Sequence, residues 1–358
     1  MTRFIIIVGF VSCLSLAACG SSTDDASTGA STTVAPADTA TAPSSVPPMS
    51  VPPTSEVPAS TAPATAPSSG EPSGFVEANQ EVGAEILRVA GTADDGPFYM
   101  VNLLDFHDGP ADYPEDSEWF GSTGAEANER YSDVIVPALA SVGAAPVFVG
   151  EVERTLLGDG VEWDQVAVVR YPSRAALLEM NSAPEVMAGL EHKDASLANT
   201  FAMLSDRMPL ATPPPVDPAA LPAPPTADDP GFMMVHVINF RDQAQYEPGQ
   251  EPDDAPISGI EAVDRYSTNA GDAAVPLGIR PEAWFEVSGT LLGEHQDWEQ
   301  VRLNSFPSQA AFEALTTNAD WASGQYHRTA GIEATYALMT QPVFFDPTFG
   351  DPDDQQPG

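Results

Sequence analysis

The chain has 358 residues, of which 52 are acidic and 13 are basic, so its formal net charge is −39. A field of that sign repels phosphate backbones and anionic lipid headgroups, which excludes nucleic acid as a partner. Since 42% of the residues are hydrophobic, the chain is long enough to bury two separate cores.

Residues 1–18 are typical of a secretory signal, because Arg3 precedes a short apolar run and small residues follow it. The segment Leu16 to Cys19 resembles a bacterial lipobox, and this resemblance implies cleavage before Cys19 and acylation of its sulfur. Two or more acyl chains give stable membrane anchoring. We therefore expect a bacterial lipoprotein held at Cys19 on the outer side of the cell membrane or in the cell envelope. The alternative is an ordinary secretory signal with a chance cysteine.

Three segments lack any periodic apolar pattern. Residues 19–73 are rich in Ser, Thr, Pro and Ala and predict a disordered stalk. Residues 209–230 form a Pro-rich linker, and residues 346–358 form an acidic tail. The only cysteines are Cys13 and Cys19, so the mature chain has no disulfide bond.

Between these segments the sequence contains a duplicated unit, at residues 74–208 and 231–345. In the first copy, FYMVNLLDF at 98–106 predicts a strand, and apolar residues at helical spacing between 127 and 142 predict a helix. Two strands follow at 146–157 and 163–171, joined by a Gly-Asp-Gly hairpin signal. Ser173 is expected to cap a second helix that breaks at Pro184, and a last strand covers 200–205. The predicted order is therefore βαββαβ.

The second copy repeats these landmarks 134 or 135 residues later. FMMVHVINF matches the first strand, Trp298-Glu-Gln matches Trp163-Asp-Gln, and His327 matches His192. A period of this length indicates a duplicated domain and not a solenoid.

The order βαββαβ predicts a ferredoxin-like unit, with a four-stranded antiparallel sheet and both helices on one face. Its bare face needs a cover, and the simplest cover is the sheet of the other unit, packed face to face. The chain also resembles the domain-of-unknown-function family 1330 in its VNLL-x-F, Trp-Asp/Glu-Gln-Val, Tyr/Phe-Pro-Ser and late His-Lys/Arg motifs. That family belongs to the dimeric α/β-barrel superfamily. We therefore predict an α+β fold with two tandem ferredoxin-like βαββαβ domains, packed sheet to sheet as a dimeric α/β-barrel within a monomeric chain.

Alternation along the strands divides the side chains into two faces. We expect Tyr99, Val101 and their second-copy equivalents to face the helices, and the alternate residues to face the other sheet. The latter set has diverged between the copies, from Asn102, Ala167 and Val169 to His236, Arg302 and Asn304. The candidate ligand-binding residues are His236, Arg302, Asn304, Glu286, Trp284, Asn102 and Glu151.

A histidine that titrates near neutrality, a carboxylate and a cation form a workable acid–base and anion-stabilising set. In the alternative, Arg302 and Glu286 form a cross-strand ion pair and His236 is a satisfied core residue. His192 and His327 end the second helix of each copy, where a cation suits the helix dipole, and they are also candidates for a pocket mouth.

The five scattered histidines do not form a metal site, and the sequence contains no cofactor fingerprint. The acidic loops at 108–118 and 247–254 lack the ligand spacing of a calcium loop, and we expect them to be solvated. Weak calcium binding there stays open.

Three functional hypotheses follow. In the first, a surface-tethered module binds a small, largely apolar molecule between the two sheets. In the second, which the superfamily resemblance suggests, the protein is a cofactor-independent oxygenase or isomerase that uses His236, Glu286 and Arg302. In the third, it is a structural or partner-binding envelope protein with a filled barrel.

Overall fold

The structure, a computed structural model, describes residues 79–210, 216–293 and 297–350, which belong to one compact unit. The expected signal peptide, Cys19, the stalk and the end of the acidic tail lie outside these residues. No helix within the described ranges is long and apolar enough to cross a membrane.

The predicted βαββαβ order is confirmed in both repeats, and each second helix is divided. The first repeat contains β1 (Phe98–Phe106), α2 (Gly124–Ser141), β2 (Ala145–Leu157), β3 (Gln165–Tyr171), α3 (Arg174–Ser182), α4 (Pro184–Ser196) and β4 (Leu197–Arg207). The second contains β5 (Phe232–Phe240), α5 (Gly259–Ala274), β6 (Arg280–Leu292), β7 (Gln300–Phe306), α6 (Gln309–Thr316), α7 (Ala319–Ser323), α8 (Gln325–Gly331) and β8 (Ile332–Phe345). Two short 3₁₀ turns lie at Pro218–Ala220 and Val275–Leu277.

Polar side chains mark the helix starts, as the sequence predicts for Ser173. The Ser173 hydroxyl accepts a hydrogen bond from the backbone of α3, and Ser308 does the same for α6. Thr123 and Ser258 form capping boxes at α2 and α5. Each cap supplies an acceptor to N–H groups that have no partner within the helix, so local sequence positions these helices. An additional helix, α1 (Gln80–Val89), precedes β1, and its Ile86 is fully buried.

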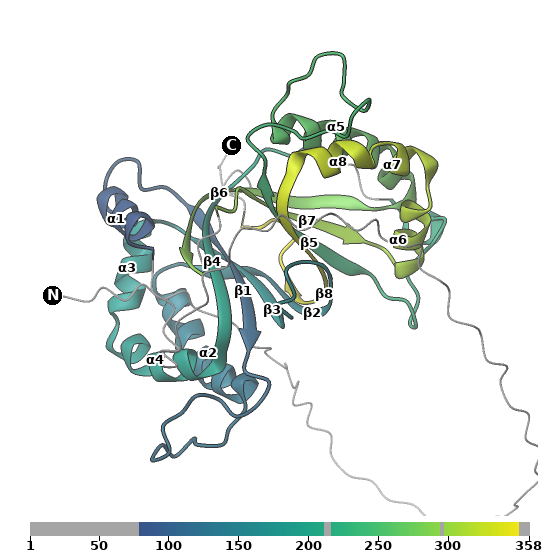
Figure 1. Cartoon of the computed structure of the whole chain (residues 1–358). Coiled ribbons are helices and arrows are strands. Elements are labelled where there is room, and N and C mark those ends of the chain that lie inside the picture. Colours follow the sequence, from purple (N-terminus) through teal and green to yellow (C-terminus); the bar gives the residue numbers. More distant parts are fainter. Residues whose placement is uncertain (1–78, 211–215, 294–296, 351–358) are drawn as a thin grey trace, which may run out of the picture. The chain divides into compact units, whose positions relative to one another are not determined.

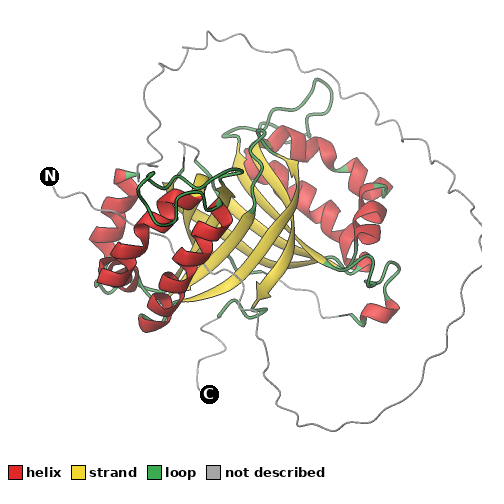
Figure 2. Cartoon of the chain, turned by 90° about the horizontal axis from the view of Figure 1, so that it is seen from below, coloured by secondary structure: helices red, strands yellow, loops and turns green. Residues whose placement is uncertain are grey.

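The eight strands form one closed barrel in the order β1-β3-β2-β8-β5-β7-β6-β4. Within each repeat the first strand lies beside the third and the third beside the second, as expected. The repeats join through antiparallel pairing of β2 with β8 and of β4 with β6. The two sheets therefore meet edge to edge through hydrogen bonds as well as through their side chains. Figures 1 and 2 show helices α1–α4 and α5–α8 on opposite sides of the strands.

The barrel interior is a packed hydrophobic core to which every strand contributes. Tyr99, Val101, Val166, Val235 and Leu303 are among its buried residues. One end contains a cluster of four aromatic rings, from Trp163, Phe201, Trp298 and Tyr336, with ring centres 5.2–6.1 Å apart.

At the start of β1, Phe349 of the C-terminal segment is fully buried against Phe285 and Phe345. The Tyr99 hydroxyl donates a hydrogen bond to the Phe349 carbonyl, which holds this segment in place. Side chains from the strands and from the C-terminal segment thus occupy the space between the sheets.

The predicted assignment of faces is wrong. Tyr99, Val101 and their equivalents point into the barrel, whereas Phe98, Met100 and their equivalents lie under the helices. Alternation separates two faces but does not say which is inside, because helices cover one face and the opposite strands cover the other. The candidate residues on the alternate positions therefore face the helices of their own repeat.

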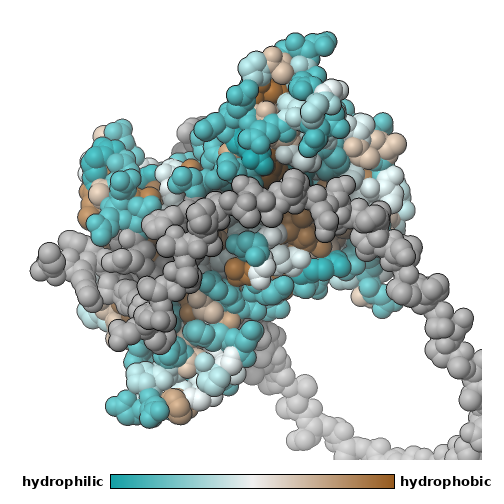
Figure 3. All heavy atoms as spheres, viewed as in Figure 1, coloured by the Kyte–Doolittle hydropathy of each residue, from teal (hydrophilic) through white to brown (hydrophobic). Residues whose placement is uncertain are grey.

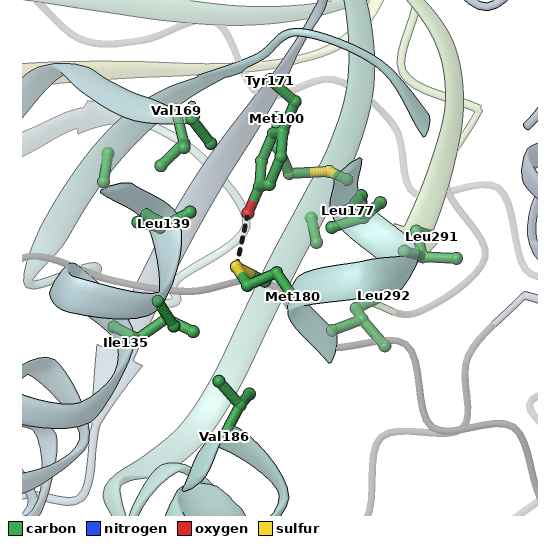
Figure 4. Close-up of a cluster of buried hydrophobic side chains, with 14 of the residues drawn as sticks. Met100, Ile135, Leu139, Val169, Tyr171, Leu177, Met180, Val186, Leu291 and Leu292 are labelled. Atoms are coloured by element: carbon green, nitrogen blue, oxygen red, sulfur yellow. Dashed lines mark hydrogen bonds between the residues drawn. The ribbon is translucent and has the colours of Figure 1, made fainter. Parts of the chain in front are cut away.

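The layer between sheet and helices differs between the repeats. In the first, a continuous core joins strands and helices, and Figure 4 shows Met100 and Tyr171 of the strands beside Ile135, Leu139, Leu177 and Met180 of the helices. In the second, buried apolar residues form two smaller clusters, one around Met234 and one around Ile238. His236 lies between these residues along β5. Most of the residues that are coloured by hydropathy on the face in Figure 3 are hydrophilic, as the net charge leads one to expect.

Candidate functional site

A row of polar side chains crosses three neighbouring strands on the helix-facing side of the second repeat. His236 on β5 is directly opposite Arg302 on β7, and Arg302 is directly opposite Trp284 on β6. Asn304 lies two residues further along β7, on the same face. Of the candidate residues from the sequence, His236, Arg302, Asn304 and Trp284 thus lie on one face of three neighbouring strands, but on the opposite face of the sheet from the one expected.

Arg302 is the most buried member of the row, with 5% of its surface exposed. Its Nε and Nη2 donate to Gln300 Oε1 at 2.9 and 2.7 Å, and its Nη1 donates to Ser267 Oγ on α5 at 2.8 Å. Its guanidinium carbon lies 4.1 Å from the centre of the Trp284 ring, a cation–π contact. The Trp284 indole in turn donates to Asn304 Oδ1 at 3.2 Å. All these partners are neutral.

The electrostatics differ from the predicted acid–base set. Burial lowers the pKa of Arg302 to about 10, although Asp264 and Tyr266 act in the opposite direction, so the guanidinium stays charged at neutral pH. Burial, and then the charges of Arg328 and Arg302, lower the pKa of His236 to about 3. The expectation that His236 titrates near neutrality is therefore wrong, because the ring is partly buried beside two cations.

Glu286 does not complete the set. It is exposed on β6, and its register partner on β7 is Gln300, not Arg302. The alternative prediction of an Arg302–Glu286 ion pair is also contradicted, since Arg302 bonds to Gln300 and Ser267 instead. Its equivalent in the first repeat, Glu151, is likewise exposed.

The equivalent positions in the first repeat carry no charge. Ala167, Val169 and Val149 take the places of Arg302, Asn304 and Trp284, and all three belong to the buried core there. Asn102 takes the place of His236, is 1% exposed, and donates to the carbonyls of Met100 and Ala167. The charged row is thus specific to the second repeat.

The helix that covers the row is also less bulky. At the positions of Ile135 and Leu139 on α2, helix α5 has Ala270 and Ala274, which are only partly buried. The side chains that α5 contributes to the layer over Arg302 are therefore smaller than those of α2 in the first repeat.

His192 and His327 lie outside this row and anchor the acidic loops. The hydroxyl of Tyr113 shares a 2.8 Å hydrogen bond with His192 Nδ1, and Tyr246 shares one of 2.7 Å with His327 Nδ1. Burial lowers the pKa of both imidazoles. Since each tyrosine lies in the long loop after its first strand, these pairs fasten the loops to α4 and α8.

Gln300 and Ser267, which hold Arg302, are not marked by any sequence pattern. Gln300 has an identical counterpart in Gln165, so comparison of the repeats carries no signal. Ser267 also matches Ser132, and only the approach of α5 to β7 brings it to Arg302.

The Arg302 row shares no residue with either of two open cavities, of about 270 and 250 Å³. The first lies between the linker, including Leu221, and the end of β7. Among the described residues, no cluster of three or more His, Cys, Asp or Glu side chains would hold a metal ion.

No family model matches the chain, and no curated protein matches it significantly. Among solved structures, a protein of unknown function from Rhodopseudomonas palustris is 30% identical, over 39% of this chain and 99% of that protein, with a TM-score of 0.33. An anthrone oxidase-like protein is 11% identical, over 70% of this chain and 93% of that protein, with a TM-score of 0.39. Chlorite dismutase from Candidatus Nitrospira defluvii is 12% identical, over 73% of this chain and 96% of that protein, with a TM-score of 0.38. In the described part of this chain, two βαββαβ repeats join at β2–β8 and β4–β6 into one closed eight-stranded barrel, so both halves of the barrel belong to one polypeptide.

Proposed function

We propose that this protein is a surface-tethered bacterial lipoprotein whose second repeat binds a small molecule between its sheet and its helices, beside Arg302 and His236. We further propose that both repeats are ferredoxin-like domains of the family 1330 type, anchored through Cys19. The space between the sheets, where the sequence predicted the ligand, is occupied by core side chains.

The single observation that carries this proposal is the buried Arg302 guanidinium with neutral partners only. A buried cation is costly unless it is paired and hydrogen-bonded, and one that persists without a counter-ion marks a candidate functional site. The first repeat has the same fold and places alanine at this position, so the fold does not require the charge. Binding of a ligand to Arg302 would account for the buried charge at this position.

The packed barrel supports the third hypothesis, a structural envelope protein, and we keep it as the second candidate. The oxygenase or isomerase hypothesis needs His236 as its general base. A histidine with a pKa of about 3 stays neutral at physiological pH and is a weak proton acceptor, so it does not suit this role.

The test is native mass spectrometry of the protein purified from membranes of its own host. The wild-type protein is expected to retain a small molecule, Arg302→Gln is expected to lose it, and Asn102→Leu in the first repeat is expected to keep it. A wild-type protein that carries no additional mass, or an Arg302→Gln protein that keeps it, contradicts the proposal. In the same preparation, Cys19→Ala is expected to move the protein from the membrane fraction to the soluble fraction.

A further inference from the structure

We infer that the ligand of the second repeat is an organic carboxylate, that its carboxylate group binds the free N–H groups of Arg302, and that His236 takes up a proton when it binds. This inference rests on the proposed small-molecule site and adds the chemical class of the ligand and a coupled proton.

The charges next to His236 are positive. Two cations, Arg302 on β7 and Arg328 on α8, influence His236 on β5. Among the residues that the structure describes, no carboxylate forms an ion pair with either arginine. From α5, Asp264 and Tyr266 act on Arg302, but neither forms a hydrogen bond with it in the described structure. The site therefore has a net positive charge that a bound anion would offset.

The Arg302 guanidinium has more hydrogen-bond donors than the described residues use. Arginine has five N–H donors, and Arg302 uses one on Nε, one on Nη2 and one on Nη1. One N–H on each terminal nitrogen stays free of a protein acceptor. Ser267 cannot turn its hydroxyl proton elsewhere, because it donates that proton to the Val263 carbonyl at 2.7 Å. The guanidinium is thus fixed by Gln300, Ser267 and Trp284, and it presents two donors to a planar oxyanion.

The neighbours of His236 along β5 and on β8 are apolar. Along β5 the residues on either side of His236 on this face are Met234 and Ile238, both buried and apolar. Ala337 is directly opposite His236 on β8, and Ala270 replaces a bulkier isoleucine on the helix above. These neighbours suit an apolar body attached to the carboxylate, and they do not suit a fully hydrated inorganic ion.

Binding of an anion is coupled to a proton at His236. In the unliganded protein His236 is neutral because of burial and because of the two arginines. An anion at Arg302 cancels part of that positive field and adds a negative charge beside the ring, so the imidazolium becomes less unfavourable. By linkage, an anion that raises the proton affinity of His236 itself binds more tightly as the pH falls. The affinity gains up to about tenfold per pH unit where binding takes up a whole proton.

The experiment uses the full mature chain with benzoate as the carboxylate probe, benzamide as its neutral analogue and inorganic phosphate as the second anion, at constant ionic strength. Thermal unfolding and calorimetric titration are followed at several pH values below neutrality. Benzoate is expected to stabilise the wild-type protein increasingly as the pH falls, whereas benzamide and phosphate have little effect. Arg302→Gln is expected to lose the effect of benzoate, and Asn102→Leu to keep it. His236→Asn is expected to bind benzoate with a much weaker dependence on pH.

A readout on the unmodified protein covers the case in which Arg302→Gln fails to fold. In the NMR spectrum the His236 signal, assigned by its absence in His236→Asn, is expected to titrate at higher pH when benzoate is present. If benzamide stabilises the protein as much as benzoate does, the inference that the ligand is an anion is overturned. If phosphate does so, the inference that the anion is an organic carboxylate is overturned. An unchanged His236 titration overturns the coupled proton. If mass spectrometry finds a neutral molecule that Arg302→Gln loses, this inference fails while the proposed site stands, whereas absence of any retained molecule and of any benzoate effect removes both.

Discussion

The low pKa of His236 predicts that this one side chain makes the protein acid-sensitive. A histidine whose pKa is lower in the folded than in the unfolded state binds its proton more readily when unfolded. Its contribution to stability is therefore fully present above its ordinary pKa of 6.5 and is lost as the pH falls from 6.5 towards about 3. In this window each pH unit lowers the free energy of unfolding by about 1.4 kcal/mol.

The variant that isolates this effect is His236→Asn, because asparagine occupies the equivalent buried position, Asn102, in the first repeat. Two pH units below 6.5 correspond to about 2.7 kcal/mol, and since the His236 ring is only partly buried we expect about 2 kcal/mol. The variant is therefore expected to lose about 2 kcal/mol less stability than the wild-type protein between about pH 7.5 and pH 4.5.

The assay is urea denaturation of both proteins at the two pH values, without added carboxylates. Other titrating groups, including His192 and His327, contribute equally to both proteins and cancel in the difference. The lowered pKa of His236 is refuted if acidification decreases the free energy of unfolding of both proteins by the same amount, within about 0.5 kcal/mol. A larger loss in the variant than in the wild-type protein would refute it as well.

Three further perturbations test the fold around the site. Phe349→Ala removes a fully buried ring from the end of the barrel. We expect urea titrations to show a free energy of unfolding that is lower by about 3–5 kcal/mol. A loss under about 1 kcal/mol would show that the segment does not close the barrel. Tyr246→Phe leaves His327 Nδ1 without its partner, so limited proteolysis of the loop at 241–258 is expected to accelerate, while the loop at 107–123 stays unchanged as the internal control. The first repeat alone, residues 79–210, would expose Tyr99, Val101 and their barrel-facing neighbours to water. We therefore expect light scattering to show a dimer or an aggregate of this fragment. A stable, soluble monomer would contradict the closed intrachain barrel.

Much of the architecture was predictable from the sequence because its signals are local. The strand at 98–106 and the cap at Ser173 depend on residue types within a few positions of each other, and both are found where they were expected. The order of elements followed from these signals, and the duplication supplied two independent copies of each. That Arg302 and His236 share a face of neighbouring strands was predictable as well, since it depends only on strand order and on alternation, whereas the expected third member, Glu286, is not next to Arg302.

The tertiary structure alone decided what surrounds that row. Alternation is symmetric between the two faces of a strand, and here both faces are buried, so the sequence by itself determined that Arg302 and His236 share a face but not which face. Closure of the barrel placed Tyr99 and Val101 inside and left Arg302 under α5, next to Ser267, which is 35 residues away along the chain. The same placement set His236 near Arg328 and Arg302, and their charges together with burial keep it neutral. Desolvation and the field of nearby charges depend on distances across the fold, and no local pattern of residues encodes those distances.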